Sequence, residues 1–196
     1  MEPNKRHLSY SLILILGSIT GLIAAMALTL EKLAKLANPN AIASCDFSLL
    51  VQCGANLNSW QGSLFGFPNP LLGLFGWSMT LVVGVAIIGK VVFPDWFLRI
   101  FTFGTLLAQL FVIWLIYVSV FMLGTLCPWC MVTWVATIPV FLGTVFWTIK
   151  EGVWGESLML FGWRAYSWLP VIVIIAYAIP AAIAQVRLDW IGNIFL

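Results

Sequence analysis

A run of fifty residues, from Ile100 to Ile149, contains no Asp, Glu, Lys, Arg or His. As a single α-helix it would extend roughly 75 Å, more than twice the roughly 30 Å of hydrocarbon in a bilayer. The run must therefore fold back on itself at a membrane. The only good place for the bend is Cys127-Pro128-Trp129-Cys130, where Pro128 suits the first position of a new helix.

The composition predicts an all-α polytopic membrane protein. Of the 196 residues, 62% are hydrophobic and only 8% are charged. Backbone groups in lipid must be satisfied within their own segment, so each apolar run should form a helix. We expect a single membrane domain, 1–196, with a four-helix transmembrane bundle and a fifth transmembrane helix. The expected helices lie at about 8–30, 70–90, 99–124, 128–149 and 167–186, with an outer cap loop at 31–69.

Charge predicts the orientation. Counting Lys and Arg on alternate sides of the expected helices gives six on the side of the N-terminus and three on the other, which places the N-terminus in the cytoplasm. A cleaved signal peptide is the alternative for the first helix, but its apolar run is longer than the roughly 7–15 residues of such a peptide. The net charge of +2 is too small and too scattered to suggest nucleic acid.

Two glycines in the first expected helix, Gly17 and Gly21, have the spacing that lets two membrane helices approach closely. Chance in a glycine-rich membrane chain would give the same pattern.

All four cysteines fall on the outer face in this topology, where disulfides persist. Two interacting dithiol pairs, Cys45 with Cys53 and Cys127 with Cys130, are the leading interpretation. Cys127 at the N-cap and Cys130 at the third helical position would have a lowered thiol pKa, because free N–H groups and the helix dipole favour thiolate. Trp134, one turn further along, would form a flat wall beneath the Cys130 sulfur.

Other roles for the cysteines stay open. Four thiolates could bind a structural zinc, although the spacing of Cys45 and Cys53 fits zinc ligands poorly, and we predict no metal. Two purely structural disulfides are also possible. The resting pattern could be Cys45–Cys53, Cys53–Cys127 or Cys127–Cys130.

The motifs resemble the vitamin K epoxide reductase family. The resemblance rests on the order of the matching segments, which are Cys45-Asp46, Cys53, Ser59, Asn69-Pro70-Leu71-Leu72-Gly73 and Cys127-Pro128-Trp129-Cys130. It implies a helix bundle around a quinone of the menaquinone, ubiquinone or vitamin K type. It further implies that Cys130 contacts the quinone, that Cys127 is its disulfide partner, and that Cys45 and Cys53 shuttle electrons from a DsbA-like thioredoxin-fold protein.

Two further residues gain roles from the resemblance. Asn69 is implied to donate a hydrogen bond to a quinone carbonyl, although an Asn before Pro70 is also a good N-cap for the second membrane helix. Ser59 is implied to orient the cap loop, and a plain turn serine is the alternative.

The sequence also departs from the family. Trp134 stands where vertebrate members have Tyr, so plain quinone reduction is expected rather than epoxide reduction. Only ten residues, 187–196, follow the fifth expected helix, so the thiol partner should be a separate protein.

The expected protein is a thiol:quinone oxidoreductase of the bacterial inner membrane that supports disulfide formation. The alternatives are a quinone-linked disulfide generator of the DsbB class, in which the two cysteine pairs occur in the reverse order, and a non-enzymatic disulfide-stapled or metal-binding membrane scaffold.

Overall fold

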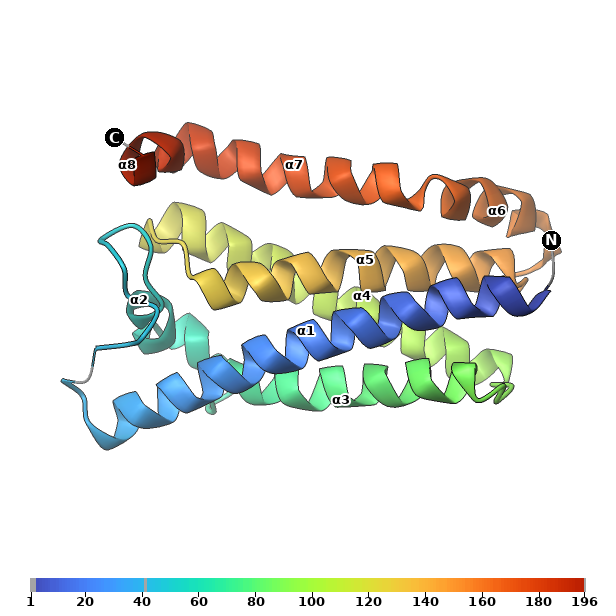
Figure 1. Ribbon diagram of the computed structural model, residues 1–196, viewed down its shortest axis with the longest axis horizontal. Coiled ribbons are helices and arrows are strands. Elements are labelled where there is room, and N and C mark those ends of the chain that lie inside the picture. Colours follow the sequence, from blue (N-terminus) through green and yellow to red (C-terminus); the bar gives the residue numbers. More distant parts are fainter. Residues whose placement is uncertain (1–2, 41, 196) are drawn as a thin grey trace.

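Long, roughly parallel helices make up most of the protein (Figure 1). The computed structural model describes residues 3–40 and 42–195. In chain order the elements are α1 (Pro3–Ala37), α2 (Gly54–Asn58), η1 (Trp60–Ser63), α3 (Asn69–Ile88), α4 (Asp95–Tyr117), η2 (Val118–Leu123), α5 (Pro128–Lys150), η3 (Glu156–Leu158), α6 (Met159–Ser167), α7 (Leu169–Leu188) and α8 (Trp190–Phe195). Within the described ranges the only extended pairing is one isolated parallel bridge, between Val51 and Leu126.

Five segments are long and apolar enough to cross a membrane. They are His7–Ala37, Asn69–Ile88, Asp95–Leu123, Pro128–Lys150 and Leu169–Leu188. The predicted all-α polytopic class is thus confirmed. The first helix continues to Ala37, seven residues beyond its predicted end at residue 30. The prediction ended the helix with the apolar run, but Lys32 and Lys35, which follow that run, do not interrupt it.

The charge-free run folds back just before the cysteine motif. α4 gives way at Val118 to the π-helical turn η2, and Gly124 then takes the left-handed conformation with φ of 64°. A residue without a Cβ adopts this conformation at little cost. The chain therefore reverses at Gly124, and Pro128 starts α5 four residues later.

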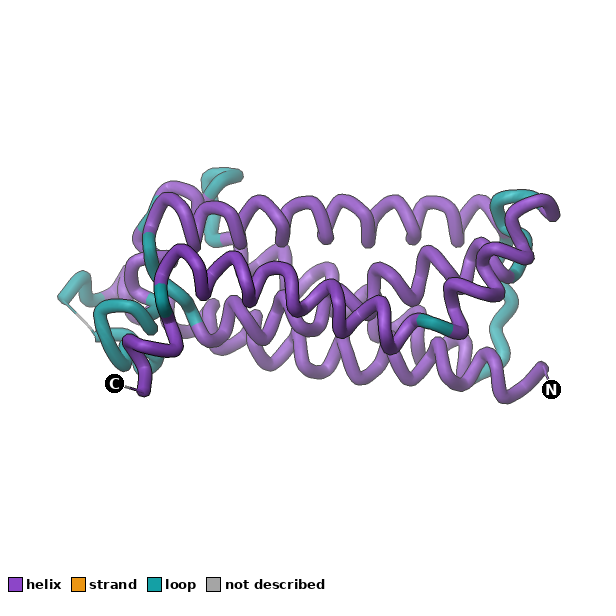
Figure 2. Tube along the Cα trace, turned by 90° about the horizontal axis from the view of Figure 1, so that it is seen from above, coloured by secondary structure: helices purple, strands orange, loops and turns teal. Residues whose placement is uncertain are grey.

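The helices form a bundle with one helix outside it. α1 packs against α3 and α5, and α4 packs against α5. α7 lies along the outer side of α5, where the Tyr177 hydroxyl donates to the Val135 carbonyl at 2.7 Å. The longer loops gather at the two ends of the bundle (Figure 2).

The end that holds the N-terminus is fixed by polar contacts between its segments. The Tyr10 hydroxyl donates to Thr144 Oγ1 at 3.0 Å, and the Tyr10 ring stacks on Trp147 with centroids 4.3 Å apart. Arg99 donates through Nε and Nη2 to the Val153 carbonyl at 3.0 and 2.8 Å. Each contact joins two different segments, so α1, α4, α5 and the turn after α5 are tied together here.

The two glycines of α1 serve two different neighbours. A Cβ on Gly17 would lie 2.5 Å from Val140 Cγ2 of α5, and a Cβ on Gly21 would lie 2.1 Å from the Trp77 ring of α3. Both distances are far below van der Waals contact. The glycine spacing is therefore a packing feature, and it lets α1 sit in the groove between α3 and α5.

Replacing Gly21 should loosen this packing. We expect Gly21→Ala to lower the free energy of unfolding by roughly 1–3 kcal/mol, because the added methyl group forces Trp77 out of place. The control is Gly76→Ala, since a Cβ at Gly76 meets nothing within 4 Å. Thermal unfolding of the detergent-solubilised proteins measures both, and equal midpoints for the two variants would contradict the packing role.

Candidate active site

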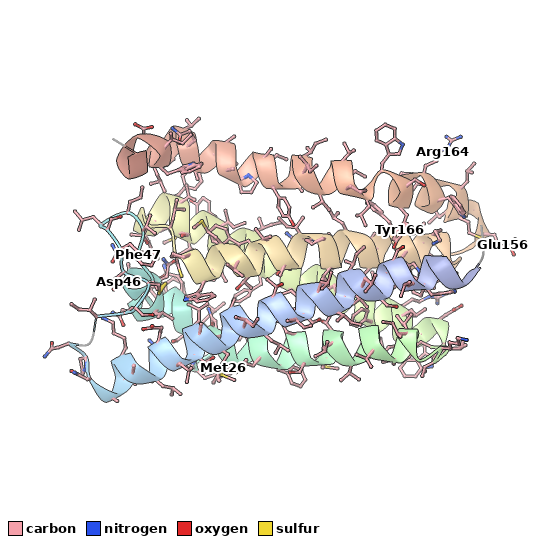
Figure 3. All side chains as sticks on the ribbon, in the orientation of Figure 1. Met26, Asp46, Phe47, Glu156, Arg164 and Tyr166 are labelled. Carbon is pink, nitrogen blue, oxygen red and sulfur yellow. A yellow bond between two sulfur atoms is a disulfide. The ribbon has the colours of Figure 1, made fainter. Side chains whose placement is uncertain are left out.

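All four cysteines lie at the end of the bundle opposite the N-terminus. Cys45, Cys53 and Cys127 belong to one buried apolar cluster, against which Trp129 and Cys130 pack. In Figure 3 the labelled Asp46 and Phe47 mark this end, and Glu156 and Arg164 mark the other. Two segments more than seventy residues apart in sequence thus place their sulfur atoms together.

The start of α5 has the predicted geometry. Cys127 is the N-cap, with an extended backbone, Pro128 is the first helical residue, and the Cys130 N–H donates to the Cys127 sulfur at 3.4 Å. The hydrogen bond from the Cys130 thiol lowers the pKa of Cys127, assisted by the N–H groups of Cys130 and Trp129 and opposed by burial. Cys127 is thereby prepared to react as a thiolate.

The other pair is oxidised. Cys45 and Cys53 form a disulfide with their Cα atoms 5.7 Å apart, whereas Cys127 and Cys130 are free thiols. The parallel bridge joins the two sites, because Leu126 N donates to the Leu50 carbonyl at 2.7 Å and Gln52 N donates to the Leu126 carbonyl at 3.1 Å. The residue before Cys53 and the residue before Cys127 are therefore held by the same backbone contact.

Asp46 positions Cys53. Its Oδ1 accepts from the N–H groups of Cys53 and Gly54, both at 2.8 Å, at the start of α2. A Cβ on Gly54 would lie 2.8 Å from Asp46 Oδ2, so the carboxylate rests directly on this helix start. Asp46 was noticed in the sequence only as part of the motif, because it caps a helix that begins eight residues later rather than its own.

Removing the Asp46 carboxylate should loosen the disulfide loop. Hydrogen bonds to charged groups contribute about 1.5–3 kcal/mol, and Asp46→Ala leaves two buried N–H groups unpaired. We expect dithiothreitol to reduce the Cys45–Cys53 disulfide faster in Asp46→Ala than in the parent protein, as followed by mass-spectrometric thiol counting. Asp46→Asn is the control, because its amide oxygen still accepts. Equal reduction rates in Asp46→Ala and the parent would exclude the positioning role.

A cavity of about 770 Å³ lies beneath the cysteine end, between α3, α4 and α5. Of the four cysteines, Cys130 alone lines it. The cavity wall also includes Trp134, Asn69 and Ser59, so the structure brings together every residue that the sequence assigned to cofactor binding. Cys45, Cys53 and Cys127 lie behind Cys130, on the side of the cap loop.

Asn69 does not cap α3, contrary to the expectation from its place before Pro70. It is the first residue of α3, and Pro68 precedes it as the N-cap. The Asn69 side chain instead donates to the Gln61 carbonyl at 2.6 Å and accepts from Leu64 N at 3.2 Å. The cap segment turns back over the helix start and offers these partners, which local sequence does not reveal.

Other cap-loop side chains complete this end of the cavity. Ser59 Oγ accepts from Gly62 N at 3.2 Å and donates to the Asn56 carbonyl at 2.8 Å, which fixes the turn between α2 and η1. Asn56 Nδ2 donates to Thr125 Oγ1 at 3.1 Å and so ties the cap loop to the turn before α5. Gln61 is buried in the cavity wall. Asn56 and Gln61 were missed from the sequence, since a polar residue in a loop is ordinarily solvated.

A metal site has no counterpart in the described part of the chain. Within residues 3–40 and 42–195, no group of three or more His, Cys, Asp or Glu side chains is placed to hold a metal ion.

The fold and site define a helical membrane protein that carries a disulfide and a thiol pair in series above an apolar cavity. Comparison with known protein families matches residues 12–145 to the vitamin K epoxide reductase family. The match covers more than half of the chain, and the chain therefore belongs to this family. A comparison with curated proteins gives no significant match. Family membership implies oxidoreductase activity through cysteines at a membrane.

Proposed function

We propose that the protein is a membrane thiol:quinone oxidoreductase that supports disulfide formation. The observation that carries the proposal is the arrangement of the four sulfur atoms, which leads from the cap loop at the end of the bundle to the cavity. The Cys45–Cys53 disulfide shares a buried cluster with Cys127, and Cys130 faces the cavity. A staple or scaffold would need neither a free thiol pair at a helix start nor a cavity beside it.

Electrons would pass inward by thiol–disulfide exchange. The thiolate of a reduced partner attacks Cys45, and the second partner thiol then displaces it, leaving the partner oxidised and Cys45 and Cys53 reduced. Cys53 next attacks Cys127 of a Cys127–Cys130 disulfide and releases the Cys130 thiolate. Cys45 then attacks Cys53 and frees Cys127. The result is a Cys45–Cys53 disulfide above two free thiols, the state found in this structure.

The last step would transfer two electrons from Cys127 and Cys130 to a quinone. The two thiols form a disulfide, and their two electrons, with two protons, convert the quinone to a quinol. Cys127, with its lowered pKa, supplies the thiolate that closes the disulfide on Cys130. The quinone is the only oxidant that the step needs. The quinol would take one proton from the Cys130 thiol and the other from water, because Cys127 reacts as a thiolate.

The cavity fits a quinone of the menaquinone, ubiquinone or vitamin K type. Its volume lies within the roughly 300–1,000 Å³ of ligand sites, and its wall is mainly apolar with a few polar groups at the Cys130 end. Trp134 offers a flat wall. Asn69 keeps one amide hydrogen beyond the bond to Gln61 and can donate it to a quinone oxygen. Ser59 holds the turn that covers the ring.

The thiol donor would be a DsbA-like thioredoxin-fold protein. The loop around the disulfide presents two apolar side chains, Phe47 and Leu49, which are 73% and 91% exposed. Cys45 itself is only 3% exposed, so the loop must move for a partner thiolate to reach it. Exposed apolar side chains on the loop that covers a buried disulfide support a macromolecular rather than a small-molecule donor.

Cys45→Ala tests the relay. It should abolish oxidation of a DsbA-like protein, while a small dithiol that reaches Cys127 directly still drives quinone reduction. Cys130→Ala is the matched control and should stop both reactions, because it removes the sulfur that faces the cavity. Quinone absorbance and partner thiol content measure the two activities. Equal loss of both in Cys45→Ala would contradict a relay, and no quinone reduction by the parent protein would reject the function.

We further propose that the protein lies in a bacterial inner membrane, with the N-terminus in the cytoplasm and all four cysteines outside. The support is the excess of Lys and Arg at the N-terminal end of the bundle.

Two single-cysteine probes test this orientation. Leu49 at the cysteine end and Val92 at the other end are both 91% exposed. In a background with the four native cysteines replaced by alanine, a membrane-impermeant maleimide should label Leu49→Cys in intact cells and Val92→Cys only after lysis. The reverse pattern would invert the orientation and remove the link to disulfide formation outside the cytoplasm.

A further inference from the structure

The Cys45–Cys53 disulfide joins two parts of the cap loop that have different tasks in the relay. We call residues 42–46 the Cys45 arm and residues 50–58 the Cys53 arm. Cys45 is only 3% exposed, so its arm has to move before a partner thiolate can reach the sulfur. Cys53 must instead stay beside Cys127, with which it shares a buried cluster, because it attacks that residue next. One arm therefore needs a contact that opens, and the other needs a contact that lasts.

The end of α1 contacts both arms. α1 runs past its apolar stretch to Ala37 and ends at the cysteine end of the bundle (Figure 1). Its residues Glu31 and Lys32 are adjacent in sequence but have different neighbours, since successive residues of an α-helix lie about 100° apart around the axis. Glu31 bonds to the Cys45 arm, and Lys32 bonds to the Cys53 arm.

Glu31 holds the Cys45 arm through the residue directly before the cysteine. Its Oε1 accepts from Ser44 N at 3.1 Å and also from the Ser44 hydroxyl. In the described part of the chain, no other hydrogen bond joins residues 42–45 to a membrane helix. The contact lies at the exposed surface, where water can replace either partner, so it can open at a small cost in free energy.

Lys32 holds the Cys53 arm at the end of α2. Its Nζ donates to the Leu57 carbonyl at 2.5 Å. Carbonyl groups in the last turn of a helix have no partner within that helix, and a positive charge is favourable there. The Leu57 side chain is 4% exposed and belongs to the buried cysteine cluster. The ammonium group thus fixes a short helix whose other end is the Cys53 N-cap.

The Cys53 arm is also bonded to the segment before Cys127. Leu126 N donates to the Leu50 carbonyl at 2.7 Å, and Asn56 Nδ2 donates to Thr125 Oγ1 at 3.1 Å. These bonds hold the arm on one side, and the ammonium group of α1 holds it on the other. The Cys53 arm is therefore fixed from two directions, whereas the contact of the Cys45 arm with α1 depends on one carboxylate.

We propose that Glu31 and Lys32 are positioning residues with opposite roles in the relay. Glu31 holds the Cys45 arm closed until a partner docks, and Lys32 keeps Cys53 beside Cys127 after the disulfide opens. The proposal rests on the proposed function, because that function assigns the relay to these cysteines. Glu31 and Lys32 exchange no electrons themselves and act only through the positions of the sulfur atoms.

A disulfide trap measures the role of Lys32 without a quinone or a partner protein. In a Cys45→Ala, Cys130→Ala background, Cys53 and Cys127 are the two remaining thiols. Diamide takes two electrons and two protons from them as they form a disulfide, which thiol counting by mass spectrometry follows. We expect Lys32→Met, which keeps an apolar stem but loses the ammonium group, to slow this step roughly 10-fold, equivalent to about 1.4 kcal/mol.

Two variants control for a general loss of structure. Lys32→Arg should restore the parent rate in the trap, because a guanidinium group can still donate to the Leu57 carbonyl. Lys35→Met should keep the parent rate, since the Lys35 ammonium group makes no hydrogen bond or ion pair with the described residues. Equal rates in Lys32→Met and the parent would overturn the role of Lys32, as would equal slowing by Lys35→Met.

The role of Glu31 predicts the opposite pattern. With all four cysteines present, Glu31→Ala should raise the rate at which dithiothreitol reduces the Cys45–Cys53 disulfide roughly 5-fold, because the arm loses its bonds to α1. The same change should leave the rate in the trap unaltered. Glu31→Gln is the matched control, since its amide oxygen still accepts from Ser44 N. Unchanged reduction in Glu31→Ala, or a trap slowed as in Lys32→Met, would overturn the division of roles.

These measurements separate the proposal from the proposed function. Failure of the parent protein to reduce a quinone would reject the proposed function. The trap and the dithiothreitol assay involve no quinone, so they would still decide whether Glu31 and Lys32 position the two arms.

Discussion

Lipid offers the backbone no water to hydrogen-bond, so each of the five long segments must be helical to satisfy its own N–H and C=O groups. Irregular backbone is then confined to the ends of the bundle. The sulfur atoms of Cys53 and Cys127 lie in this irregular part, because Cys127 is the N-cap of α5 and Cys53 is the N-cap of the short helix α2. The helices thus restrict the sulfur atoms to the end of the bundle, and the fold of the cap loop determines which of them lie close together.

The two ends of the bundle differ for a physical reason. At the N-terminal end, a buried hydrogen bond from Tyr10 joins α1 to α5, and hydrogen bonds from Arg99 join α4 to the turn after α5. Burial, together with the charge of Glu151, raises the pKa of Tyr166 at this end to about 12. At the cysteine end, the contacts that join the segments are backbone hydrogen bonds and helix caps from loops, such as the bond from Leu126 N to the Leu50 carbonyl. One end can therefore hold the bundle together while the other exchanges disulfides.

The sequence was sufficient for features governed by local rules or by the bilayer. The apolar runs predicted the membrane helices, and Pro128 predicted Cys127 as an N-cap. Features that depend on a distant partner were out of reach. From its place before Pro70, Asn69 was expected to cap α3. Its side chain instead bonds to the Gln61 carbonyl and to Leu64 N, which the cap segment brings back over the helix start. Asp46 caps α2 only because the disulfide loop folds back onto Cys53.

The glycines show the same division more sharply. Gly17 and Gly21 follow a recognisable spacing, and both are needed because α1 lies close to Val140 and Trp77. Gly76 and Gly104 follow no spacing, since they sit on different helices, and their shared feature is the empty space beside each. A glycine required for close packing and a glycine beside empty space look alike in a sequence. Only the position of the neighbouring helix separates them, and here that position leaves α3 and α4 apart along the side that faces lipid.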